Sequence, residues 1–326
     1  MKTKYILSTV EIDEHARSHL IESLEPGWKY KMDGELAGNE LENVEVLLLS
    51  GGWLTEDHIH PLKNLRVIQS LSAGVDHLNF GIIPEKVIIC ANAGAFAGPI
   101  AEFVFGAVIS LGRNLEQHDR EMREGRFVRT SLGLYLKGKT IGVLGTGGIG
   151  QDVARLAKSF GMRSIGVNTS GKMVPNFDEV TTIARMDSVL KRSDVIVVAM
   201  PLTLKTRNLL GQREFGYLKS DCIIVNVARG AIINEQALYE FLREHPKAKA
   251  ALDVWWNYPK PGEEKVLQNY PISSLPNVLS SPHFSDGVDE NSKLGSDSAV
   301  ANILRYVRKD EPLRGVVRRE DYLVQN

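Results

Sequence analysis

The chain has 326 residues, of which 43% are hydrophobic and 24% are charged, and its formal net charge at pH 7 is -1. This near-neutral balance gives no long-range attraction to nucleic acid or to a membrane surface, so it argues against both as partners and favours small-molecule chemistry. The length exceeds the usual size of one domain and predicts two domains with a cleft between them.

Short β-rich runs alternate with amphipathic stretches in the first third of the chain. The runs that predict strands are 5–10, 44–50, 67–71 and 87–91. Such alternation is typical of a parallel sheet covered by helices. From Pro99 onward, apolar residues recur at spacings of three and four, which predicts a long helix that leaves this first domain.

A second and longer series of strands and helices begins at Thr140. A strand over 140–144 leads into a glycine-rich turn and then into a helix over 149–160. Further strands are predicted at 164–167, 195–199, 223–227, 249–252 and 278–280. This α/β pattern predicts a Rossmann-type doubly wound parallel sheet.

The last helical stretch, around 300–307, stops near Pro312 because proline cannot continue a helix. We expect this helix to pack on the first domain. The smaller domain, a flavodoxin-like α/β unit, then comprises 1–98 and 290–326, and the larger domain comprises 99–289.

The turn at 145–150 has the spacing Gly-x-Gly-x-x-Gly between a predicted strand and a predicted helix. In this context Gly145 permits the tight bend, Gly147 lets the backbone approach a pyrophosphate, and Gly150 allows close helix packing. The helix N-terminus also offers N–H groups to phosphates. A glycine turn without a ligand is the plain alternative, but the strand and helix favour a dinucleotide-binding domain. The expected contacts are Gly145, Thr146, Gly147, Gly148, Ile149 and Gly150.

The end of the next predicted strand should carry an acidic residue if the cofactor is NAD, because a carboxylate binds the adenosine ribose hydroxyls. This chain has Asn168 there, followed by Thr169, Ser170 and Lys172. A neutral residue removes repulsion against a 2′-phosphate, and hydroxyls with a lysine can donate hydrogen bonds to it. The segment therefore favours NADP. It leaves NAD open, since Asn168 can also bind a plain ribose while Lys172 is a solvated surface charge.

Two charged residues follow predicted strands of the larger domain, at the edge where open α/β sheets bind ligands. Arg229 can direct two N–H donors onto a carboxylate or carbonyl oxygen, although a salt bridge at the strand end would also explain it. Asp253 can accept a hydrogen bond from a nicotinamide amide, with turn chemistry as the plainer explanation.

His283 lies directly after the predicted strand 278–280, and its imidazole can exchange a proton near neutral pH. We therefore expect it to be the general acid/base. Other histidines stand in polar or helical surroundings without a metal-ligand pattern, so no metal is predicted. These are His15, His19, His58, His60, His118 and His245.

Taken together, these features resemble the D-isomer-specific 2-hydroxyacid dehydrogenase family, which includes glyoxylate/hydroxypyruvate reductases and phosphoglycerate dehydrogenases. The resemblance covers nearly the whole chain. It rests on the glycine turn, on segment 189–203 and on segment 218–230. It implies that Arg229 binds the carboxylate and carbonyl of the substrate, that His283 carries the proton, and that Asp253 orients the nicotinamide.

The resemblance also makes the smaller domain the substrate domain. Its backbone N–H groups are expected to bind the substrate carboxylate, where a glycine permits close approach, at Ser72, Ala73 and Gly74. Further cofactor contacts are expected at Pro201, Thr206, Val227 and Ala228. The family also implies a homodimer, with the helix that begins near Pro99 as a contact.

Two aromatic residues are candidates for the wall of the substrate pocket. Trp53 follows another strand of the smaller domain, although packing under a loop explains it equally well. Tyr258 stands where the family usually has a glutamate hydrogen-bonded to the catalytic histidine. Such a glutamate would raise the pKa of the histidine and fix its ring. Its absence predicts either that His283 is a weaker acid/base at neutral pH or that another group takes the place of the glutamate.

We therefore predict an NAD(P)-dependent oxidoreductase that transfers a hydride between NAD(P)H and a small 2-oxo or 2-hydroxy acid, such as glyoxylate or hydroxypyruvate. Two alternatives stay open because of Tyr258. One is a formate- or phosphite-type dehydrogenase of the same superfamily. The other is a dinucleotide-sensing regulatory protein with little turnover.

The start of the sequence lacks the apolar core of a signal peptide, and no apolar run is long enough to span a bilayer. The two cysteines, Cys90 and Cys222, lie in apolar runs, where a free thiol packs as a small hydrophobe. We expect a cytoplasmic protein in which neither thiol is catalytic or disulfide-bonded.

Overall fold

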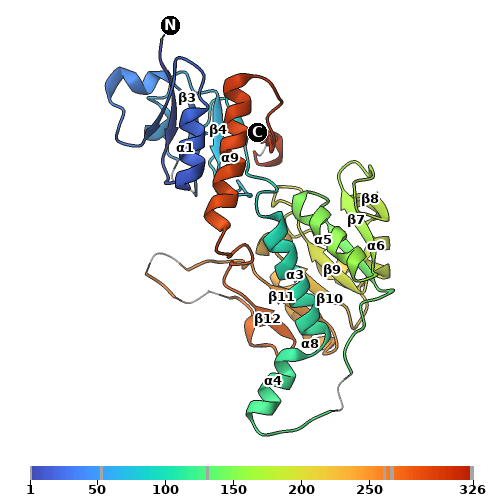
Figure 1. Ribbon diagram of the computed structural model, residues 1–326. Coiled ribbons are helices and arrows are strands. Elements are labelled where there is room, and N and C mark those ends of the chain that lie inside the picture. The colour runs from blue at the N-terminus through green and yellow to red at the C-terminus, as the bar shows by residue number, and fades with distance from the viewer. Residues whose placement is uncertain (1, 52–53, 130–131, 260–261, 265–267, 324–326) are drawn as a thin grey trace. The chain divides into compact units, whose positions relative to one another are not determined.

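A computed structural model describes residues 2–51, 54–129, 132–259, 262–264 and 268–323 (Figure 1). The chain divides into two compact units, Met1–Phe96 with Val288–Asn326, and Ala97–Gly287. Each unit contains one parallel sheet with helices packed on it, so the predicted α/β class is confirmed. In the described residues, no helix combines the length and the apolar character needed to cross a membrane.

The first unit has a five-stranded sheet in the order β2-β1-β3-β4-β5. Its strands are β1 Lys4–Ser8, β2 Trp28–Met32, β3 Val44–Leu49, β4 Val67–Ser70 and β5 Ile88–Cys90. Its helices are α1 Glu14–Glu22, α2 Glu56–Ile59 and α9 Asn291–Arg308. Figure 1 shows α1 and α9 side by side on one face of this sheet.

The C-terminal helix α9 belongs to the first unit because its apolar stripe is buried there. Ala299, Val300, Ile303 and Leu304 pack with Val46 and Leu48 of β3 and with Leu20 of α1. Asn302 adds a polar anchor: its side-chain amide donates to Gln69 and its oxygen accepts from the Arg314 backbone. The last helix of the chain therefore packs on the sheet of the first unit.

The second unit has a seven-stranded sheet in the order β12-β11-β10-β9-β6-β7-β8, with every pair of neighbours parallel. Its strands are β6 Thr140–Leu144, β7 Arg163–Asn168, β8 Glu179–Thr182, β9 Val195–Val198, β10 Ile223–Asn226, β11 Lys249–Leu252 and β12 Val278–Ser280. Its helices are α3 Ala97–Gly112, α4 Leu115–Arg123, α5 Gly148–Ser159, α6 Met186–Arg192, α7 Gln212–Phe215 and α8 Glu235–Glu244. Short 3-10 helices of the chain are η1 Gly38–Asn43, η2 Ile183–Arg185, η3 Gly230–Ile232, η4 Ile272–Ser274 and η5 Arg319–Asp321.

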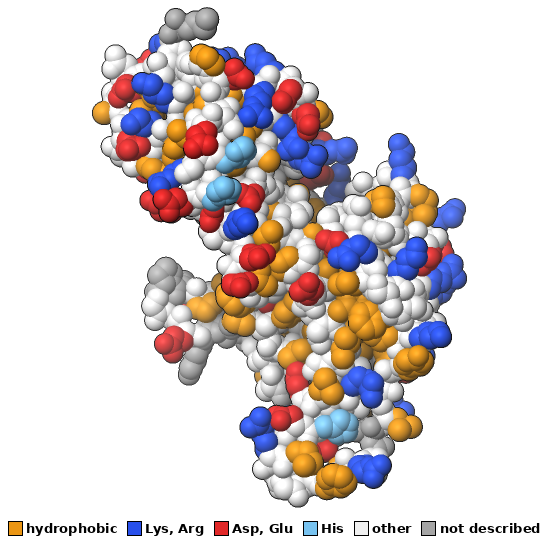
Figure 2. Space-filling model, viewed as in Figure 1, with side chains coloured by type: hydrophobic (Ala, Val, Ile, Leu, Met, Phe, Trp, Pro, Cys, Tyr) orange, Lys and Arg blue, Asp and Glu red, His pale blue; other side chains and the backbone are white. Residues whose placement is uncertain are grey.

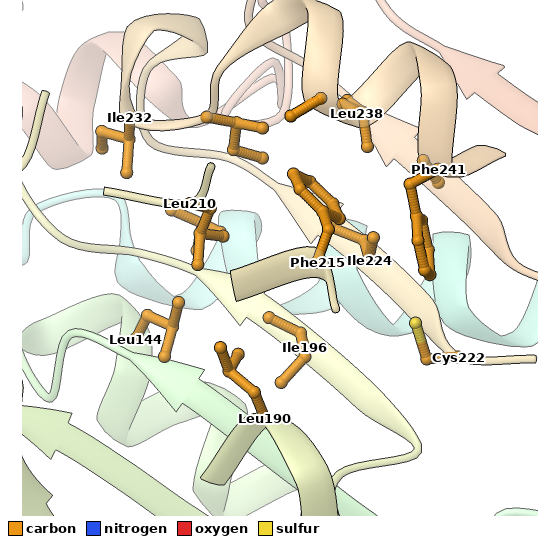
Figure 3. Packing of buried hydrophobic residues seen from close by; sticks show 14 of the residues in the cluster. Leu144, Leu190, Ile196, Leu210, Phe215, Cys222, Ile224, Ile232, Leu238 and Phe241 are labelled. Carbon is orange, nitrogen blue, oxygen red and sulfur yellow. The ribbon is translucent and has the colours of Figure 1, made fainter. Parts of the chain in front are cut away.

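Helices cover both faces of this sheet. On one face, α3 and α5 lie next to each other (Figure 1). On the other, α6, α7 and α8 share one hydrophobic core with the strands (Figure 3). Leu190, Phe215 and Phe241 of these three helices point toward Ile196 and Ile224 of the sheet. Each large side chain buried in this way stabilises the fold by roughly 1.5–3 kcal/mol.

The strand order reverses direction at β6. The chain runs from β6 outward to β7 and β8, then returns to β9 on the opposite side of β6. In open parallel sheets, ligands bind beyond the carboxyl ends of the strands at this kind of switch point. The loops that follow β6, β7, β9, β10, β11 and β12 therefore form the edge where a binding site is expected.

Candidate active site

The turn after β6 owes its shape to glycines. Gly145 has a φ of +109°, and a Cβ atom there would lie 2.5 Å from the carbonyl oxygen of Ala199. A Cβ on Gly150 would overlap the carbonyl oxygen of Gly145. Neither position can take a side chain without moving the backbone. Gly145 thus lets the turn lie close to the chain after β9, and Gly150 lets α5 lie close to the turn.

At Gly147, packing within the protein does not require a glycine. Its φ is -73°, and a Cβ there would meet nothing within 4 Å. It is the N-cap of α5, and a glycine has no side chain with which to cap this helix end. The first turn of α5 therefore directs backbone N–H groups into open space, an arrangement that suits a phosphate group. The residues present fit the pyrophosphate of a dinucleotide.

Asn168, at the end of β7, shapes the next loop. Its side-chain oxygen accepts hydrogen bonds from the N–H groups of Ser170 (3.1 Å) and Gly171 (2.6 Å). Its amide donates to the Thr146 hydroxyl (3.0 Å) in the glycine turn and to the Lys172 carbonyl (3.1 Å). Asn168 is half-buried, whereas the side chains of Ser170 and Lys172 are exposed. The loop thus presents a hydroxyl and a lysine beside the glycine turn, and its shape depends on a carboxamide.

The loop after β9 is held by Thr206, which is 7% exposed. The Thr206 hydroxyl donates to the Pro201 carbonyl (2.7 Å) and accepts from the Thr203 N–H (2.8 Å). After β10, Val227 is buried and the Ala228 N–H donates to the Asn226 side chain (3.1 Å). These cofactor candidates therefore follow neighbouring strands of one sheet edge.

Arg229 follows β10 directly and is half-buried. One guanidinium nitrogen donates to the Ala228 carbonyl (2.8 Å), and the Arg229 carbonyl accepts from the Asn226 amide (3.0 Å). The next residue, Gly230, lies so close to the Trp255 backbone that a Cβ there would overlap it. The loop that carries Arg229 is therefore packed against the loop that follows β11.

Asp253, the first residue after β11, is fully buried. One carboxylate oxygen accepts from the Ser281 hydroxyl (2.5 Å) and the Phe284 N–H (2.8 Å), and the other accepts from the Ser285 N–H (3.0 Å). These bonds give Asp253 a role in shaping the loop after β12. They fit the turn chemistry considered for it from sequence, while its contact with a nicotinamide stays a prediction.

His283 stands in the loop that Asp253 holds. Its backbone has a φ of +60°, uncommon for a residue other than glycine, and its side chain is exposed. The Tyr258 ring lies beside the imidazole, with a centroid distance of 5.3 Å and an interplanar angle of 36°. The Tyr258 hydroxyl accepts a hydrogen bond from the Trp255 N–H (3.2 Å). The residue at the position of the family's glutamate is thus in ring contact with the predicted acid/base.

The candidate substrate loop of the first unit follows β4. The Ser72 N–H already donates to the Ser70 hydroxyl (3.0 Å). In the described part of the chain, nothing accepts a hydrogen bond from the N–H groups of Ala73 and Gly74. The Ala73 and Gly74 N–H groups therefore suit a substrate better as donors than the Ser72 N–H does. The other candidate from this unit, Trp53, lies outside the described residues.

Sequence reasoning missed two residues that organise this edge. Trp255 links both sides of the site, since its indole N–H donates to the Ser281 carbonyl (2.9 Å) and its backbone N–H binds Tyr258. Ser281 in turn donates to Asp253. The sequence placed both residues next to predicted site residues, but it gave no sign of their hydrogen bonds.

The two cysteines are free and fully buried. Burial raises the pKa of Cys90 to about 11 and that of Cys222 to about 12. Both thiols are therefore protonated at neutral pH and are poor nucleophiles. In the described residues, no group of three or more His, Cys, Asp or Glu side chains is placed to hold a metal ion.

The chain is similar to several named proteins. It is 35% identical to a D-3-phosphoglycerate dehydrogenase of Methanocaldococcus jannaschii, over 85% of this chain and 52% of the relative. It is 34% identical to a hydroxypyruvate reductase of Thermotoga maritima, over 75% of this chain and 78% of the relative. The chain spans little more than half the length of the phosphoglycerate dehydrogenases that it matches.

Two solved structures share the fold over nearly the whole chain. One is a putative formate dehydrogenase from Pyrobaculum aerophilum, with a TM-score of 0.82, 26% identity and coverage of 99% of this chain and 100% of that chain. The other is a D-isomer specific 2-hydroxyacid dehydrogenase from Xanthobacter autotrophicus Py2 in complex with NADPH and MES, with a TM-score of 0.79, 25% identity and coverage of 99% and 100%.

The family model for the NAD binding domain of D-isomer specific 2-hydroxyacid dehydrogenases matches residues 105–285. This segment makes up more than half of the chain and contains the glycine turn, Arg229, Asp253 and His283. The chain therefore belongs to the D-isomer specific 2-hydroxyacid dehydrogenase family.

Proposed function

We propose that the chain reduces a small 2-oxo acid to the 2-hydroxy acid with NAD(P)H, and catalyses the reverse reaction. The observation that carries the proposal is the placement of Arg229 and His283. Both follow parallel strands of the sheet whose strand β6 leads into the glycine turn, so they share a carboxyl edge with a phosphate-compatible helix end. Relatives named glyoxylate reductase and hydroxypyruvate reductase support this substrate class.

The two side chains supply complementary chemistry. The Arg229 guanidinium can bind a carboxylate through paired N–H donors while polarising the neighbouring carbonyl. When bound, NAD(P)H supplies the hydride that the carbonyl carbon receives. His283 gives a proton to the carbonyl oxygen, and the product is the 2-hydroxy acid. In the reverse direction His283 takes the hydroxyl proton back.

The first unit has its own part in the proposal. Backbone N–H groups do not titrate, so those of Ala73 and Gly74 suit a fixed negative charge such as a substrate carboxylate. Asp253 is proposed to orient the nicotinamide through the oxygen that accepts from the Ser285 N–H, because a carboxylate oxygen can accept a second bond. Trp53 and Tyr258 stay candidates for the pocket wall.

We propose NADP rather than NAD as the preferred cofactor. The loop after β7 offers the exposed side chains of Thr169, Ser170 and Lys172, and its first residue is the neutral Asn168. A 2′-phosphate gains donors there and meets no carboxylate from these residues. A related structure that holds NADPH is in keeping with this preference.

A homodimer is also part of the proposal. The apolar side chains of α3 are largely buried within its own unit, so the free apolar surface lies further along the chain. Phe127, Leu132 and Tyr135 are 76%, 94% and 73% exposed, and Leu115 and Met122 of α4 are half exposed. Figure 2 shows hydrophobic side chains gathered at the surface around this end of the unit. Apolar side chains exposed in this way are typical of subunit contacts, and we place the contact here. A cytoplasmic location remains a prediction.

The proposal is tested by following NADPH and NADH oxidation with glyoxylate, hydroxypyruvate and larger 2-oxo acids. The parent protein is compared with Arg229→Ala and His283→Ala, and with the matched controls Arg308→Ala and His15→Ala at exposed positions of the other unit. We expect turnover by the parent and controls and a large loss in both site variants. Equal activity in all five proteins would contradict the proposed roles of Arg229 and His283.

The same proteins, assayed in the oxidative direction with NADP+ or NAD+, separate the alternative functions. Formate or phosphite oxidation without 2-oxo acid reduction would favour the formate-type reaction, which the name of one structural neighbour suggests. Tight NADPH binding with negligible turnover on every acid would favour a dinucleotide-sensing role. Either result would replace the proposed reaction while leaving the family and the fold unchanged.

A further inference from the structure

Tyr258 is fixed at its hydroxyl end and contacts His283 with its ring. The hydroxyl oxygen accepts from the Trp255 N–H at 3.2 Å. The ring centroid lies 5.3 Å from that of the imidazole, within the range of aromatic pairs. The ring is 42% exposed, so burial in the core is not what places it. A planar group held at one end therefore lies beside the imidazole, tilted by 36° to its plane.

Trp255 also bonds to the loop after β12 that carries His283, residues 281–285, which we call the histidine loop. Its indole N–H donates to the Ser281 carbonyl at 2.9 Å, two residues before His283. Trp255 itself is 5% exposed and belongs to the core of the second unit. One buried residue, Trp255, thus bonds to both the Tyr258 hydroxyl and the start of the histidine loop. These two bonds restrict the distance between the Tyr258 and His283 rings.

His283 depends on such contacts for its orientation. Its backbone is anchored on the C-terminal side, because the Phe284 and Ser285 N–H groups both donate to Asp253. Its side chain is exposed, and an exposed side chain exchanges rotamers on a fast timescale unless neighbours restrict it. The Tyr258 ring is such a neighbour, since it is in ring contact with the imidazole.

We propose that Tyr258 is a positioning residue for His283: its ring holds the imidazole in the orientation that transfers the proton. This inference rests on the proposed function, in which His283 is the acid/base. It differs from the pocket-wall role considered above, because a wall residue would act on the substrate and this residue acts through His283. A hydrophobic side chain without a planar ring cannot replace it, whereas phenylalanine, which keeps the ring but not the anchoring hydroxyl, replaces it in part.

The test compares Tyr258→Leu, Tyr258→Phe and His283→Ala, alone and combined, by turnover of the best 2-oxo acid with NADPH. A misplaced catalytic group costs up to roughly 100-fold in rate, so we expect Tyr258→Leu to lower kcat by about 10- to 100-fold. The KM for the acid and the Kd for NADPH should not change. Tyr258→Phe keeps the ring but loses the hydroxyl that accepts from the Trp255 N–H, so it should lower kcat by a smaller factor than Tyr258→Leu does.

The decisive comparison is the double variant Tyr258→Leu/His283→Ala. Residues that act as one unit are strongly non-additive, so the leucine should cost nothing further once the imidazole is gone. In an Arg229→Ala background, Tyr258→Leu should lower kcat by the same factor as it does in the parent protein. If the losses from Tyr258→Leu and His283→Ala multiply in the double variant, the proposal is overturned. If Tyr258→Leu raises KM for the acid and leaves kcat unchanged, the proposal is also overturned, and Tyr258 is a substrate contact.

Failure of this inference is distinguishable from failure of the proposed function. If His283→Ala is fully active, the reaction assignment itself is wrong. If His283→Ala is impaired while Tyr258→Leu is not, only the positioning role is wrong. Thermal unfolding and NADPH binding monitor folding. If Tyr258→Leu does not fold, Tyr258→Phe, which removes only the hydroxyl and its bond to the Trp255 N–H, is taken through the same cycle with His283→Ala, and additivity there likewise contradicts the proposal.

Discussion

The Ser281 hydroxyl donates a 2.5 Å hydrogen bond to the buried Asp253 carboxylate, 28 residues earlier in the chain. The two residues follow neighbouring strands, β11 and β12, and their bond ties the two loops together at the carboxyl edge of the sheet. With the Phe284 and Ser285 N–H groups on the same carboxylate, His283 stands between anchored neighbours. The predicted acid/base is thus held by its surroundings before any substrate binds.

Replacing Asp253 by asparagine should loosen this loop. An asparagine amide cannot accept from all three donors, so at least one N–H or O–H group loses its acceptor in a buried place. Such a loss costs about 1–3 kcal/mol. We expect a lower melting temperature and faster hydrogen exchange at the Phe284 and Ser285 amides, measured by mass spectrometry.

Ser281→Ala provides the matched control, since it removes one donor and leaves the carboxylate bonded to both amides. It should destabilise the loop less than Asp253→Asn does. Equal exchange rates at Phe284 and Ser285 in the parent protein and in Asp253→Asn would show that the carboxylate does not hold the loop.

Two alanine substitutions in the glycine turn should have opposite consequences. Gly150→Ala places a Cβ on the Gly145 carbonyl oxygen and should destabilise the second unit strongly. Gly147→Ala meets nothing within 4 Å in the protein and has a φ that alanine tolerates, so stability should be unchanged. Its methyl group would instead occupy the space proposed for the pyrophosphate.

Thermal unfolding and NADPH titration of both variants check this contrast. We expect Gly147→Ala to unfold like the parent protein while its NADPH affinity falls at least about tenfold, a loss of about 1.4 kcal/mol. Unchanged NADPH affinity in Gly147→Ala would rule out cofactor binding at this turn.

The sequence predicted the central strands of both sheets well. Strands β6 and β11 match the expected ranges at both ends, because apolar β-rich runs mark strands buried on both faces. The edge strand β12 also matches its expected range, although it is only partly buried. The prediction missed β2 and β8, which lie at sheet edges and are only partly buried. Edge strands carry polar and charged side chains, so they lack the hydrophobic pattern on which the prediction relied.

The candidate site could be predicted only in part. The strand ends placed Arg229, Asp253 and His283 at one edge, since parallel strands present their carboxyl ends together. The contact between Tyr258 and His283 could not be derived in this way. It depends on how the loop after β11 folds back onto the loop after β12, which local sequence patterns do not specify.

Asn168→Asp should change the cofactor preference. The aspartate can still accept from Ser170 and Gly171, but it cannot donate to the Thr146 hydroxyl and it brings a negative charge toward a 2′-phosphate. We expect NADPH affinity to fall by about 10-fold or more while NADH affinity holds or rises, as one repelled charge-assisted bond is worth about 1.5–3 kcal/mol.

Fluorescence titration of both cofactors measures this ratio. Lys172→Ala serves as a comparison, because it should weaken NADPH binding without the gain for NADH. If Asn168→Asp binds the two cofactors in the same ratio as the parent protein does, the loop after β7 does not choose between them.

The Cys222 thiol should be unreactive in the folded protein. Burial raises its pKa to about 12 from an ordinary value of 9.0, so the thiolate is scarce at pH 8 and the sulfur is inaccessible. Because the raised pKa favours the protonated folded state, its stabilising effect is present below pH 9.0 and declines as the pH rises toward 12. Labelling with a thiol reagent should therefore occur only on unfolding, and rapid labelling at pH 8 would contradict the buried placement.

The most direct test of the account is a single-turnover measurement of NADPH oxidation by a 2-oxo acid, with the parent protein and His283→Ala saturated with both ligands. General acid catalysis contributes about 10²–10⁴-fold to such a step. We predict that His283→Ala is slower by a factor in this range, with unchanged NADPH affinity, and that His15→Ala matches the parent. An unchanged single-turnover rate in His283→Ala would contradict the assignment of His283 as the proton donor.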